Sequence, residues 1–411
     1  MRDAPARVLL VGAGVTSSIV ARLLHGAAPQ LEVHVWEKAR GVGGRMSVAR
    51  SDATGGRADM GAQYVTEVDG VAGAHRALYA ELERAGVLLP MRASISGTRG
   101  ADGGGQNWVA PAGLNAVAKA LLRASGARVS LGRGVAAVER VVVARADGAT
   151  AAKWRVSRVP RAARAPPAAD ADAADDAEDD IFDAVVLTMP VPQVLELGGA
   201  VADGLRERPD LLDRLRAVEY SARYALALFW AREDDAARSF VDRLPWDCRY
   251  VPKEEESAIV FVSRCAHKRR AATNDGGDAN ARDTAVEPPS FVVHSSVPFA
   301  LAKLRDGADT AVVGTELLER VRALLPGLPP PADSRTQLWR FSQVRVPIHA
   351  ERAAHALSAD GEPPLLIAGD AFSAHGSRFD GCYESARDAA EQLLAQLGLD
   401  AARPGAPPSA L

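Results

Sequence analysis

The sequence has few of the residues that would cross-link the chain. Its 411 residues include three cysteines, Cys248, Cys265 and Cys382, an odd number with no C-x-x-C pair, so no disulfide framework is expected. A reducing compartment fits this usage best. The first apolar run is only four residues long before the glycines begin, too short for a signal segment or a membrane span. We therefore expect a cytoplasmic protein without a membrane partner.

Charge of either sign is not in excess. With 49 Lys and Arg against 52 Asp and Glu, the net charge is −3, and no basic stripe runs along the chain. A nucleic-acid partner is therefore not expected. The sequence also lacks a G-x-S-x-G elbow and a metal-ligand cluster, so we predict no metal site. At about 150 residues per domain, the length predicts two to three domains or two interleaved ones.

Two segments offer nothing to bury. Residues 160–180 consist mainly of Ala, Pro and Asp, and residues 266–289 are polar and charged with several glycines. Both are predicted to be mobile, solvated insertions. A docking tail is the alternative for the acidic run, but a surface loop is favoured.

The first candidate motif is a glycine turn between a strand and a helix, in "VLLVGAGVTSSIVARLL" at 8–24. Gly12 permits the sharp turn, Gly14 removes the Cβ that would block a pyrophosphate, and the helix N-terminus offers N–H groups to phosphates. Ser17 stands where a third Gly or Ala is usual, so the fingerprint is imperfect and, alone, weak.

Two features strengthen the dinucleotide interpretation. Glu37 ends the next strand, "LEVHVWE" at 31–37, where a carboxylate accepts hydrogen bonds from an adenosine ribose and would repel a 2′-phosphate. A second glycine loop, "GVGGRM" at 41–46, follows directly and suits a flavin better than a nicotinamide cofactor. The alternatives are an exposed charge at a strand end and a surface turn.

A second strand, Gly-Asp and helix occur near the end of the chain, in "PLLIAGDAFSAHGSRFDGCYESARDAAEQLL" from 363. FAD is long, so a fold that binds it extended must hold its two ends with separate parts of the chain. Gly369 and Asp370 would lie beside the ribityl and phosphate, and the helix beginning near Gly381 and Cys382 would direct N–H groups at the flavin ring. The structural alternative is a last strand and helix that complete the sheet.

Several long strings resemble the renalase family of FAD-dependent, amine-oxidase-like flavoproteins. They occur in family order over roughly 8–393 and include "DMGAQYVT" at 59–66, "LTMPVP" at 187–192, "YSARYALALF" at 220–229, "VVHSSVPF" at 292–299, "LLPGLPPP" at 324–331, "WRFSQV" at 339–344 and "FDGCYESA" at 379–386. The two insertions lie outside the resemblance, and Ser17 departs from it.

The resemblance implies an α/β fold of the p-hydroxybenzoate hydroxylase and amine oxidase type. A Rossmann-type FAD-binding domain would comprise 1–70, 106–190 and 325–400, and a mixed-sheet substrate domain would comprise 71–105 and 191–324. FAD would be bound non-covalently, with no link through Cys382.

The residues and the resemblance together predict two groups of site residues. The predicted FAD contacts are Gly12, Ala13, Gly14, Thr16, Ser17, Glu37, Lys38, Gly43, Gly44, Arg45, Met46, Gly61, Ala62, Gln63, Tyr64, Val135, Gly369, Asp370, Gly381 and Cys382. The candidate catalytic or substrate residues are Tyr64, Arg223, His294, Trp339 and Arg340. Tyr64 and Trp339 could form an aromatic slot for a nicotinamide ring. Tyr224 is more typical of a core residue.

The activity implied by the resemblance is oxidation of the 2- and 6-dihydro isomers of NAD(P)H, with O2 as acceptor and H2O2 as product. Hydride transfer from a dihydropyridine needs no general base, so positioning residues are expected rather than a triad. An amine oxidase is the alternative within the enzymes, although the window 335–344 has no lysine to hold a water near the flavin. A non-catalytic escort protein on the same scaffold is the alternative of another class.

Overall fold

The computed structural model describes residues 5–68, 74–97, 105–145, 148–159, 180–270, 287–348 and 351–399. The chain divides into two compact units, of which unit 1 is Met1–Gly44, Ala118–Glu219 and Val344–Leu411, and unit 2 is Arg45–Val117 and Tyr220–Gln343. Unit 1 thus takes its three stretches from the start, middle and end of the chain. These units change after residues 44, 117, 219 and 343, whereas the predicted domain borders, which stay a prediction, lie at 70, 105, 190 and 324. The segment after Gly44 falls in unit 2 because Arg57–Asp59 contact a strand and a helix of that unit.

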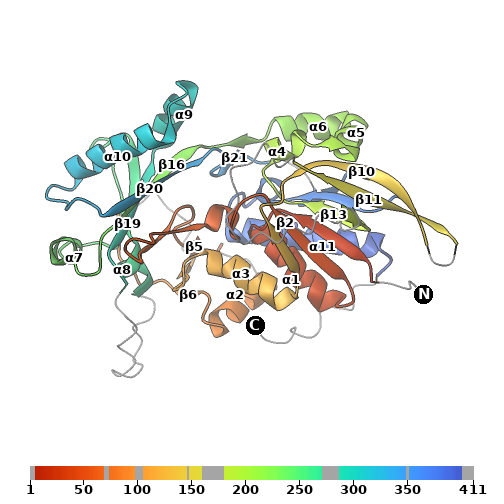
Figure 1. The fold of residues 1–411 in the computed structure, drawn as a ribbon, viewed down its shortest axis with the longest axis horizontal. Coiled ribbons are helices and arrows are strands. Elements are labelled where there is room, and N and C mark those ends of the chain that lie inside the picture. Colours follow the sequence, from red (N-terminus) through yellow and green to blue (C-terminus); the bar gives the residue numbers. More distant parts are fainter. Residues whose placement is uncertain are drawn as a thin grey trace. The chain divides into compact units, whose positions relative to one another are not determined.

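A six-stranded sheet forms the centre of unit 1 (Figure 1), in the order β22-β23-β13-β1-β2-β9. Its strands are β1 (Arg7–Val11), β2 (Glu32–Glu37), β9 (Arg128–Leu131), β13 (Ala184–Leu187), β22 (Ala354–Ala356) and β23 (Leu365–Ala368). All pairs are parallel except β22 with β23. The central strands read RVLLV, AVVL and LLIA and are almost wholly buried, as expected of a parallel sheet covered on both faces.

Two long helices of unit 1, α1 (Val15–Ala27) and α11 (Phe379–Gln396), pack against one another. A second sheet has the order β12-β11-β10-β14, with β12 (Ile181–Phe182), β11 (Thr150–Arg158), β10 (Val135–Ala144) and β14 (Gly198–Gly199). The short helices are α4 (Val191–Leu195), α5 (Ala200–Arg206) and α6 (Pro209–Arg216). Strand β13 ends at Leu187, and Pro192 lies in the first turn of α4, where a missing N–H costs nothing.

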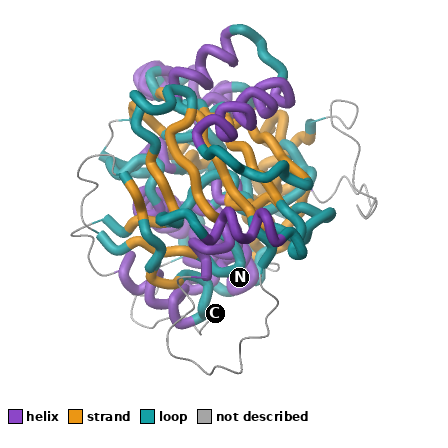
Figure 2. Tube along the Cα trace, turned by 90° about the vertical axis from the view of Figure 1, so that its left-hand side faces the viewer, coloured by secondary structure: helices purple, strands orange, loops and turns teal. Residues whose placement is uncertain are grey.

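Unit 2 is built on a six-stranded sheet in the order β20-β16-β19-β18-β17-β7. Its strands are β7 (Ile95–Ser96), β16 (Arg223–Phe229), β17 (Cys248–Tyr250), β18 (Ile259–Arg264), β19 (Ser290–Ser295) and β20 (Asp333–Trp339). The helices of this part are α7 (Asp235–Asp242), α8 (Cys265–Arg270), α9 (Val297–Arg305) and α10 (Thr310–Leu324). Figure 2, turned so that the left-hand side of Figure 1 faces the viewer, shows strands side by side with helices next to them.

The two faces of this sheet have different partners. Tyr224, Leu226 and Leu228 of β16 lie in the core that includes residues of α9 and α10, whereas Ala225, Ala227 and Phe229 lie in a cluster with Ala58 and Met60. Because side chains alternate along a strand, the same rule assigns Arg223 to the second face. We call this second face, which includes Ala225, Ala227 and Phe229 of β16 together with Ala58 and Met60, the Met60 face.

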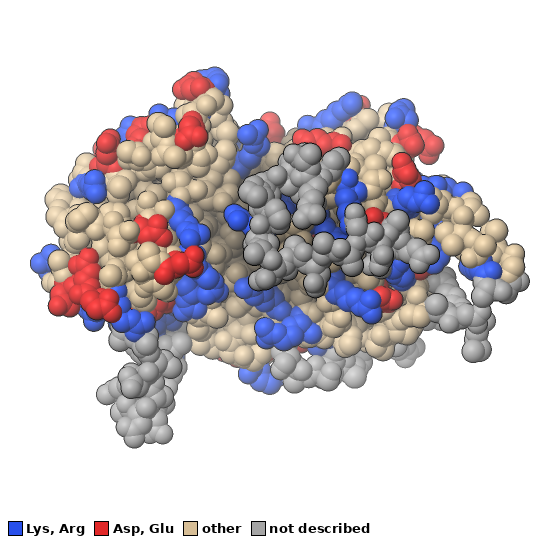
Figure 3. Space-filling model, in the orientation of Figure 1, with Lys and Arg blue, Asp and Glu red and all other residues tan. Residues whose placement is uncertain are grey.

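The remaining elements follow in chain order. They are β3 (Val48–Arg50), β4 (Arg57–Asp59), β5 (Val65–Thr66), α2 (Ala74–Arg84), β6 (Leu89–Pro90), β8 (Asn107–Val109), α3 (Asn115–Ser125), β15 (Glu219–Tyr220), β21 (Val344–Val346) and the single turns of 3-10 helix Gly44–Met46 and Asp370–Phe372. Within the described ranges, no helix combines the length and the apolar character that a membrane crossing requires. Figure 3 shows side chains of both charge signs on the face in view.

The two predicted insertions have different outcomes. Residues 160–179 and 271–286 lie outside the described residues. The prediction of a solvated segment is wrong at 266–270, which belong to α8 and include the buried Lys268 and Arg269, and Glu287 at the other end contacts Arg269. The polar sequence could not reveal this burial, because the partners of Lys268 and Arg269, the carboxylates of Asp59 and Glu287, lie elsewhere in the chain.

Candidate functional site

The glycine turn after β1 leaves the first turn of α1 uncapped. Gly12 has a φ of +102° and donates its N–H to the Trp36 carbonyl at 2.7 Å. Gly14 is the N-cap residue of α1, no side chain caps it, and the first turn has no acidic residue. A Cβ added to Gly14 would meet nothing within 4 Å, so there is open space beside the helix N-terminus. These features fit an anionic group such as a pyrophosphate.

Glu37 holds the turn from the end of β2. Its carboxylate accepts N–H groups from Ala13 at 2.8 Å and from Ala39 at 2.7 Å, one on each oxygen. The side chain is buried, and each carboxylate oxygen keeps a lone pair for a further donor. The predicted ribose contact therefore remains possible beside a structural role that sequence reasoning did not anticipate.

The second glycine loop lies against the first. Gly43 donates its N–H to the Ala13 carbonyl at 2.9 Å, and a Cβ on Gly44 would lie 3.5 Å from Cα of Gly14. Both Gly43 and Gly44 have positive φ, at 125° and 53°. The two loops thus form one cradle of backbone groups, which Lys38 flanks as an exposed side chain.

Ser17 fits at the third position because its hydroxyl has a partner. Its Oγ lies 2.6 Å from Oγ1 of Thr188, which itself donates to the Val11 carbonyl at 2.9 Å. Ser17 is fully buried, and Thr16 is nearly so. Thr188, in the string "LTMPVP", was not a predicted site residue, and only the family string pointed to it.

The late Gly-Asp lies at the same sheet edge as the first glycine turn. Because β1, β13 and β23 are parallel neighbours, their carboxyl ends bring Gly12, Thr188 and Gly369 together. A Cβ on Gly12 would lie 3.0 Å from Oγ1 of Thr188, and one on Gly369 would lie 3.7 Å from the Thr188 carbonyl oxygen. Widely separated parts of the chain therefore converge within unit 1, which is where ligands of open α/β sheets bind.

The residues after Gly369 are tightly held. Asp370 is buried and accepts the Ser377 hydroxyl, and Gly369 donates its N–H to Oγ of Ser385 at 2.7 Å. Helix α11 begins at Phe379, two residues earlier than predicted, so Gly381 lies within its first turn. A Cβ on Gly381 would lie 2.4 Å from the Gly376 carbonyl oxygen, which explains the glycine by packing alone.

Two further predicted cofactor residues belong to unit 1. Cys382 is half-buried, and Val135 is buried at the start of β10.

In unit 2, the segment 45–64 forms a loop that approaches itself closely. Ala62 donates its N–H to the Arg45 carbonyl at 2.9 Å, and a Cβ on Gly61 would lie 1.9 Å from that oxygen, so only glycine fits there. Met46 is buried. The loop brings the predicted Gln63 and Tyr64 to the Met60 face.

Two predicted substrate residues, Trp339 and His294, contact the carbonyl oxygen of Met60. Nε1 of Trp339 donates to it at 2.9 Å, and Nε2 of His294 lies 3.2 Å from it. Trp339 pairs with Arg223 across β20 and β16, and His294 pairs with Ala225 across β19 and β16. Arg223 is buried and donates to the Ser295 carbonyl at 2.9 Å.

An aromatic row continues from His294. Its ring lies 5.8 Å from that of Phe261, which lies 5.0 Å from the ring of Tyr250. The hydroxyls of Tyr250 and Tyr64 are 2.6 Å apart. Tyr64 thus lies at the end of this row, which it joins through Tyr250. The aromatic slot between Tyr64 and Trp339 stays a prediction.

Two residues of this region do not join the group. Arg340 is exposed beyond the end of β20. Tyr224 belongs to the core on the opposite face, where burial raises the pKa of its phenol and the charge of Arg340 opposes that rise.

Sequence reasoning missed the buried charges behind the Met60 face. Lys268 of α8 is fully buried, and its ammonium contacts Oδ2 of Asp59 at 3.2 Å, the Gln63 carbonyl at 2.6 Å and Oε1 of Gln63 at 3.1 Å. Arg269 contacts the same Asp59 oxygen at 3.1 Å and also Glu287 at 2.5 Å. Burial alone would raise the pKa of Asp59, but Lys268 and Arg269 hold it below its ordinary value.

His294 is kept neutral. Burial, followed by the nearby positive charge of Arg223, lowers the pKa of His294 to about 3, although its hydrogen bond to Met60 opposes the change. The imidazole is therefore uncharged at physiological pH and is a weak base. No group of three or more His, Cys, Asp or Glu side chains is placed to hold a metal ion in the part of the chain that the structure describes.

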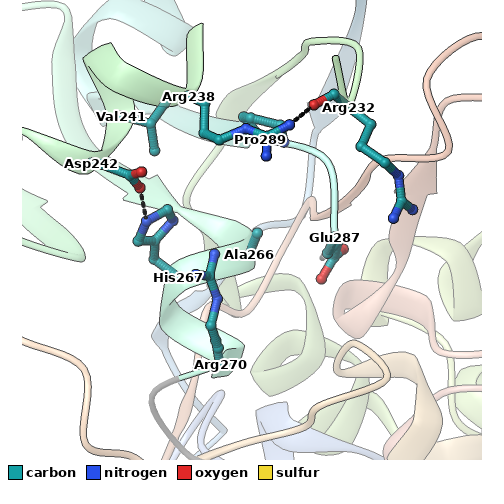
Figure 4. A pocket seen from close by; sticks show the side chains of 9 residues that line it. All are labelled: Arg232, Arg238, Val241, Asp242, Ala266, His267, Arg270, Glu287 and Pro289. Atoms are coloured by element: carbon teal, nitrogen blue, oxygen red, sulfur yellow. Dashed lines mark hydrogen bonds and ion pairs between the residues drawn. The ribbon is translucent and has the colours of Figure 1, made fainter. Parts of the chain in front are cut away.

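A small pocket in unit 2 lies next to this charged network and shares Glu287 with it (Figure 4). Its lining consists of Arg232, Arg238, Val241, Asp242, Ala266, His267, Arg270, Glu287 and Pro289. His267 is paired with Asp242 at 2.7 Å. Its volume of about 40 Å³ is enough for a few water molecules.

Comparisons with known proteins agree with this geometry. Residues 10–82 match the family described as "NAD(P)-binding Rossmann-like domain", and residues 273–394 match the family described as "Flavin containing amine oxidoreductase". Renalase of Mus musculus is 34% identical over 383 residues, which cover 92% of this chain and 96% of that protein. The chain belongs to the renalase family.

The fold is also shared with a more distant protein. A putative protoporphyrinogen oxidase from Exiguobacterium sp. 255-15 aligns over 97% of this chain and all of its own, with a TM-score of 0.59 and 14% identity. The predicted Rossmann-type and mixed-sheet architecture is confirmed. As a member of the renalase family with a flavin amine oxidoreductase domain, the protein is an FAD-dependent oxidoreductase, and the backbone cradle of unit 1 fits the cofactor's pyrophosphate.

Proposed function

We propose that this protein is an oxidase of the 2- and 6-dihydro isomers of NAD(P)H. The substrate would become NAD(P)+ by losing a hydride to FAD, and the reduced flavin would then give its two electrons to O2, which with that hydrogen and one further proton forms H2O2. The bound flavin supplies both the hydride acceptor and the reaction with O2. Family membership supports this choice of substrate class.

The observation that carries the proposal is the chemistry of the Met60 face. It presents aromatic rings, a neutral imidazole and an indole N–H that is bound to a carbonyl. Its charged groups, Arg223 and the Lys268–Asp59 pair behind it, are bound to protein partners. A dihydropyridine becomes a pyridinium by losing hydride alone, so it needs a flat apolar slot and no base. Oxidation of an ammonium substrate would first require removal of a proton, for which His294 is poorly suited.

The buried Lys268 bears on the amine oxidase alternative. A lysine that holds a water near a flavin must keep a donor for that water. The three ammonium protons of Lys268 are matched by three protein oxygens, one from Asp59 and two from Gln63. This arrangement favours the dihydronicotinamide reaction over amine oxidation.

We further propose that FAD is held non-covalently and that the protein is cytoplasmic. The first proposal is supported by the backbone cradle around Gly14 and Glu37, which could bind the pyrophosphate and ribose through hydrogen bonds alone. The second is supported by the three cysteines, none of which forms a disulfide and two of which are buried. Acid precipitation tests the link: FAD should stay in the supernatant, and flavin that sediments with the protein would contradict it.

The test of activity is anaerobic mixing of the holoprotein with the separated 2-, 4- and 6-dihydro isomers and, in parallel, a panel of amines. We expect rapid loss of the oxidised flavin absorbance with the 2- or 6-isomer and little change with the 4-isomer or any amine. Bleaching by amines alone would overturn the proposal. A colourless protein that does not take up added FAD would support the escort-protein alternative.

A further inference from the structure

The protonation of His294 follows from its neighbours. Nε2 lies 3.2 Å from the Met60 carbonyl oxygen, which has no proton to give, so the hydrogen bond requires the proton to be on Nε2. The other neighbour of Nε2, the side-chain amide nitrogen of Gln63 at 3.4 Å, has two protons and two closer acceptors: the carbonyl oxygens of Asp59 at 2.5 Å and Gly61 at 3.1 Å. Gln63 therefore has no proton left for His294.

The buried Lys268 fixes this orientation of Gln63. An ammonium group donates only, so the end of the amide that faces Lys268 at 3.1 Å must be the oxygen Oε1. A flipped amide would place its NH2 group against the ammonium and its oxygen against two carbonyls. Lys268 is thus a positioning residue that acts on His294 through Gln63.

A neutral imidazole with its proton on Nε2 has an unprotonated Nδ1. Although most of the side chain is buried, the residue is partly exposed, and Nδ1 is not among the fully buried nitrogens that lack a partner. The hydrogen bonds of the ring nitrogens within the described residues are all made by Nε2. Nδ1 is therefore an acceptor that a ligand can reach, on the face that also carries Trp339 and the aromatic row. The groups whose charge acts on the ring are Arg223 and Lys268, which both disfavour its protonation.

We propose that Nδ1 of His294 accepts a hydrogen bond from the carboxamide N–H of the nicotinamide ring, and so selects amide over acid forms of the substrate. This inference rests on the proposed function. A carboxylate in the same place has no proton to give, and its oxygens would face the Nδ1 lone pair. The loss of this hydrogen bond should make the acid form bind at least about tenfold more weakly than the amide form.

The test compares binding of NAD+ and of its deamido analogue, nicotinic acid adenine dinucleotide, to the oxidised holoprotein by perturbation of the flavin spectrum. We expect the wild type to bind NAD+ at least about tenfold more tightly. In His294→Phe, which keeps a flat ring without an acceptor, the two affinities should become equal within about threefold. The control, His267→Asn in the pocket of Figure 4, should keep the wild-type preference.

A wild type without preference, or a His294→Phe protein that keeps it, would overturn the inference. Kinetics with the dihydro isomers separate this failure from that of the proposed function. Flavin reduction without an amide preference refutes carboxamide recognition alone, whereas an amide preference in binding without reduction by any isomer refutes the oxidase activity alone.

A measurement on the wild type avoids dependence on the folding of a variant. In protein labelled with 15N-histidine, His294 should show a protonated Nε2 and an unprotonated Nδ1 from about pH 8 to about pH 5. Addition of NAD+ should shift the Nδ1 signal in the direction of hydrogen bonding. A proton on Nδ1 would exclude the proposed contact.

Discussion

The two units make their candidate sites from different materials. In unit 1, the cradle consists mainly of backbone groups at glycines, with Glu37 and Thr188 bracing the turn from neighbouring strands. In unit 2, the Met60 face depends on side chains whose orientation is set by buried charges, Lys268 and Asp59 above all. We therefore expect the cradle of unit 1 to tolerate substitutions except where a larger side chain would fill the space for the ligand. The Met60 face of unit 2 should be sensitive to substitution of any residue in its network.

The largest effect is expected from breaking the buried network. Lys268→Met removes one of two cations from Asp59, which is 1% exposed, and leaves Gln63 without its donor. We expect the free energy of unfolding to fall by about 3–5 kcal/mol, as measured by denaturant titration. The control, Asp213→Asn, removes the exposed pair with Arg216 and should cost less than about 1 kcal/mol. Equal losses in the two variants would show that burial does not distinguish the pairs.

A second test uses the pH dependence of stability. His294 has a folded-state pKa of about 3, below its ordinary value, so between about pH 3 and 6.5 the unfolded chain binds a proton that the folded protein does not. The stability should therefore fall as the pH falls through this window, by at most about 1.4 kcal/mol per pH unit for this residue.

The comparison with His294→Gln isolates the residue. The variant should lose part of the slope of unfolding free energy against pH, while the contributions of the other histidines remain in both proteins. Identical slopes would mean that His294 titrates normally in the folded state.

A third test addresses the backbone cradle. Gly14→Ala adds a methyl group in open space, at a φ of −84° that any residue adopts, so the fold should be unaffected. The same methyl group occupies the space that a pyrophosphate needs, and we expect FAD to bind at least about tenfold more weakly, or about 1.4 kcal/mol. Val312→Ala, on the exposed surface of α10 in unit 2, is the control and should bind FAD normally. Unchanged FAD affinity in Gly14→Ala would refute the cradle.

The smallest effect is expected at the hydroxyl pair behind the cradle. Ser17→Ala removes the 2.6 Å contact with Thr188 and should lower the free energy of unfolding by about 1 kcal/mol without changing the FAD content. Calorimetry together with the flavin-to-protein ratio measures both. A loss of FAD without a loss of stability would instead place Ser17 in direct contact with the cofactor.

The contrast between the units also explains what could be predicted from the sequence. The glycine turn, Glu37 and the late Gly-Asp are local signals, because each glycine marks a conformation or a close approach of the backbone. Their convergence followed from the rule that parallel strands end at one edge, which the register of β1, β13 and β23 obeys.

The network of unit 2 gives no local signal. Lys268 and Asp59 are 209 positions apart, and Lys268 adjoins a polar run that suggested a solvated insertion. Nothing in "CAHKRR" distinguishes a buried cation from an exposed one. His294 and Trp339 were identified as candidates, but their shared acceptor, the Met60 carbonyl, is a backbone atom that no residue type reveals.

The position of β23 has a consequence for biosynthesis. The strand supplies Gly369 to an edge whose other contributors, Gly12 and Thr188, leave the ribosome far earlier. Until β23 has been synthesised, the inner strand β13 lacks one of its two neighbours and the edge lacks Gly369. We therefore expect this sheet edge, and any ligand site on it, to be completed only after β23 has left the ribosome.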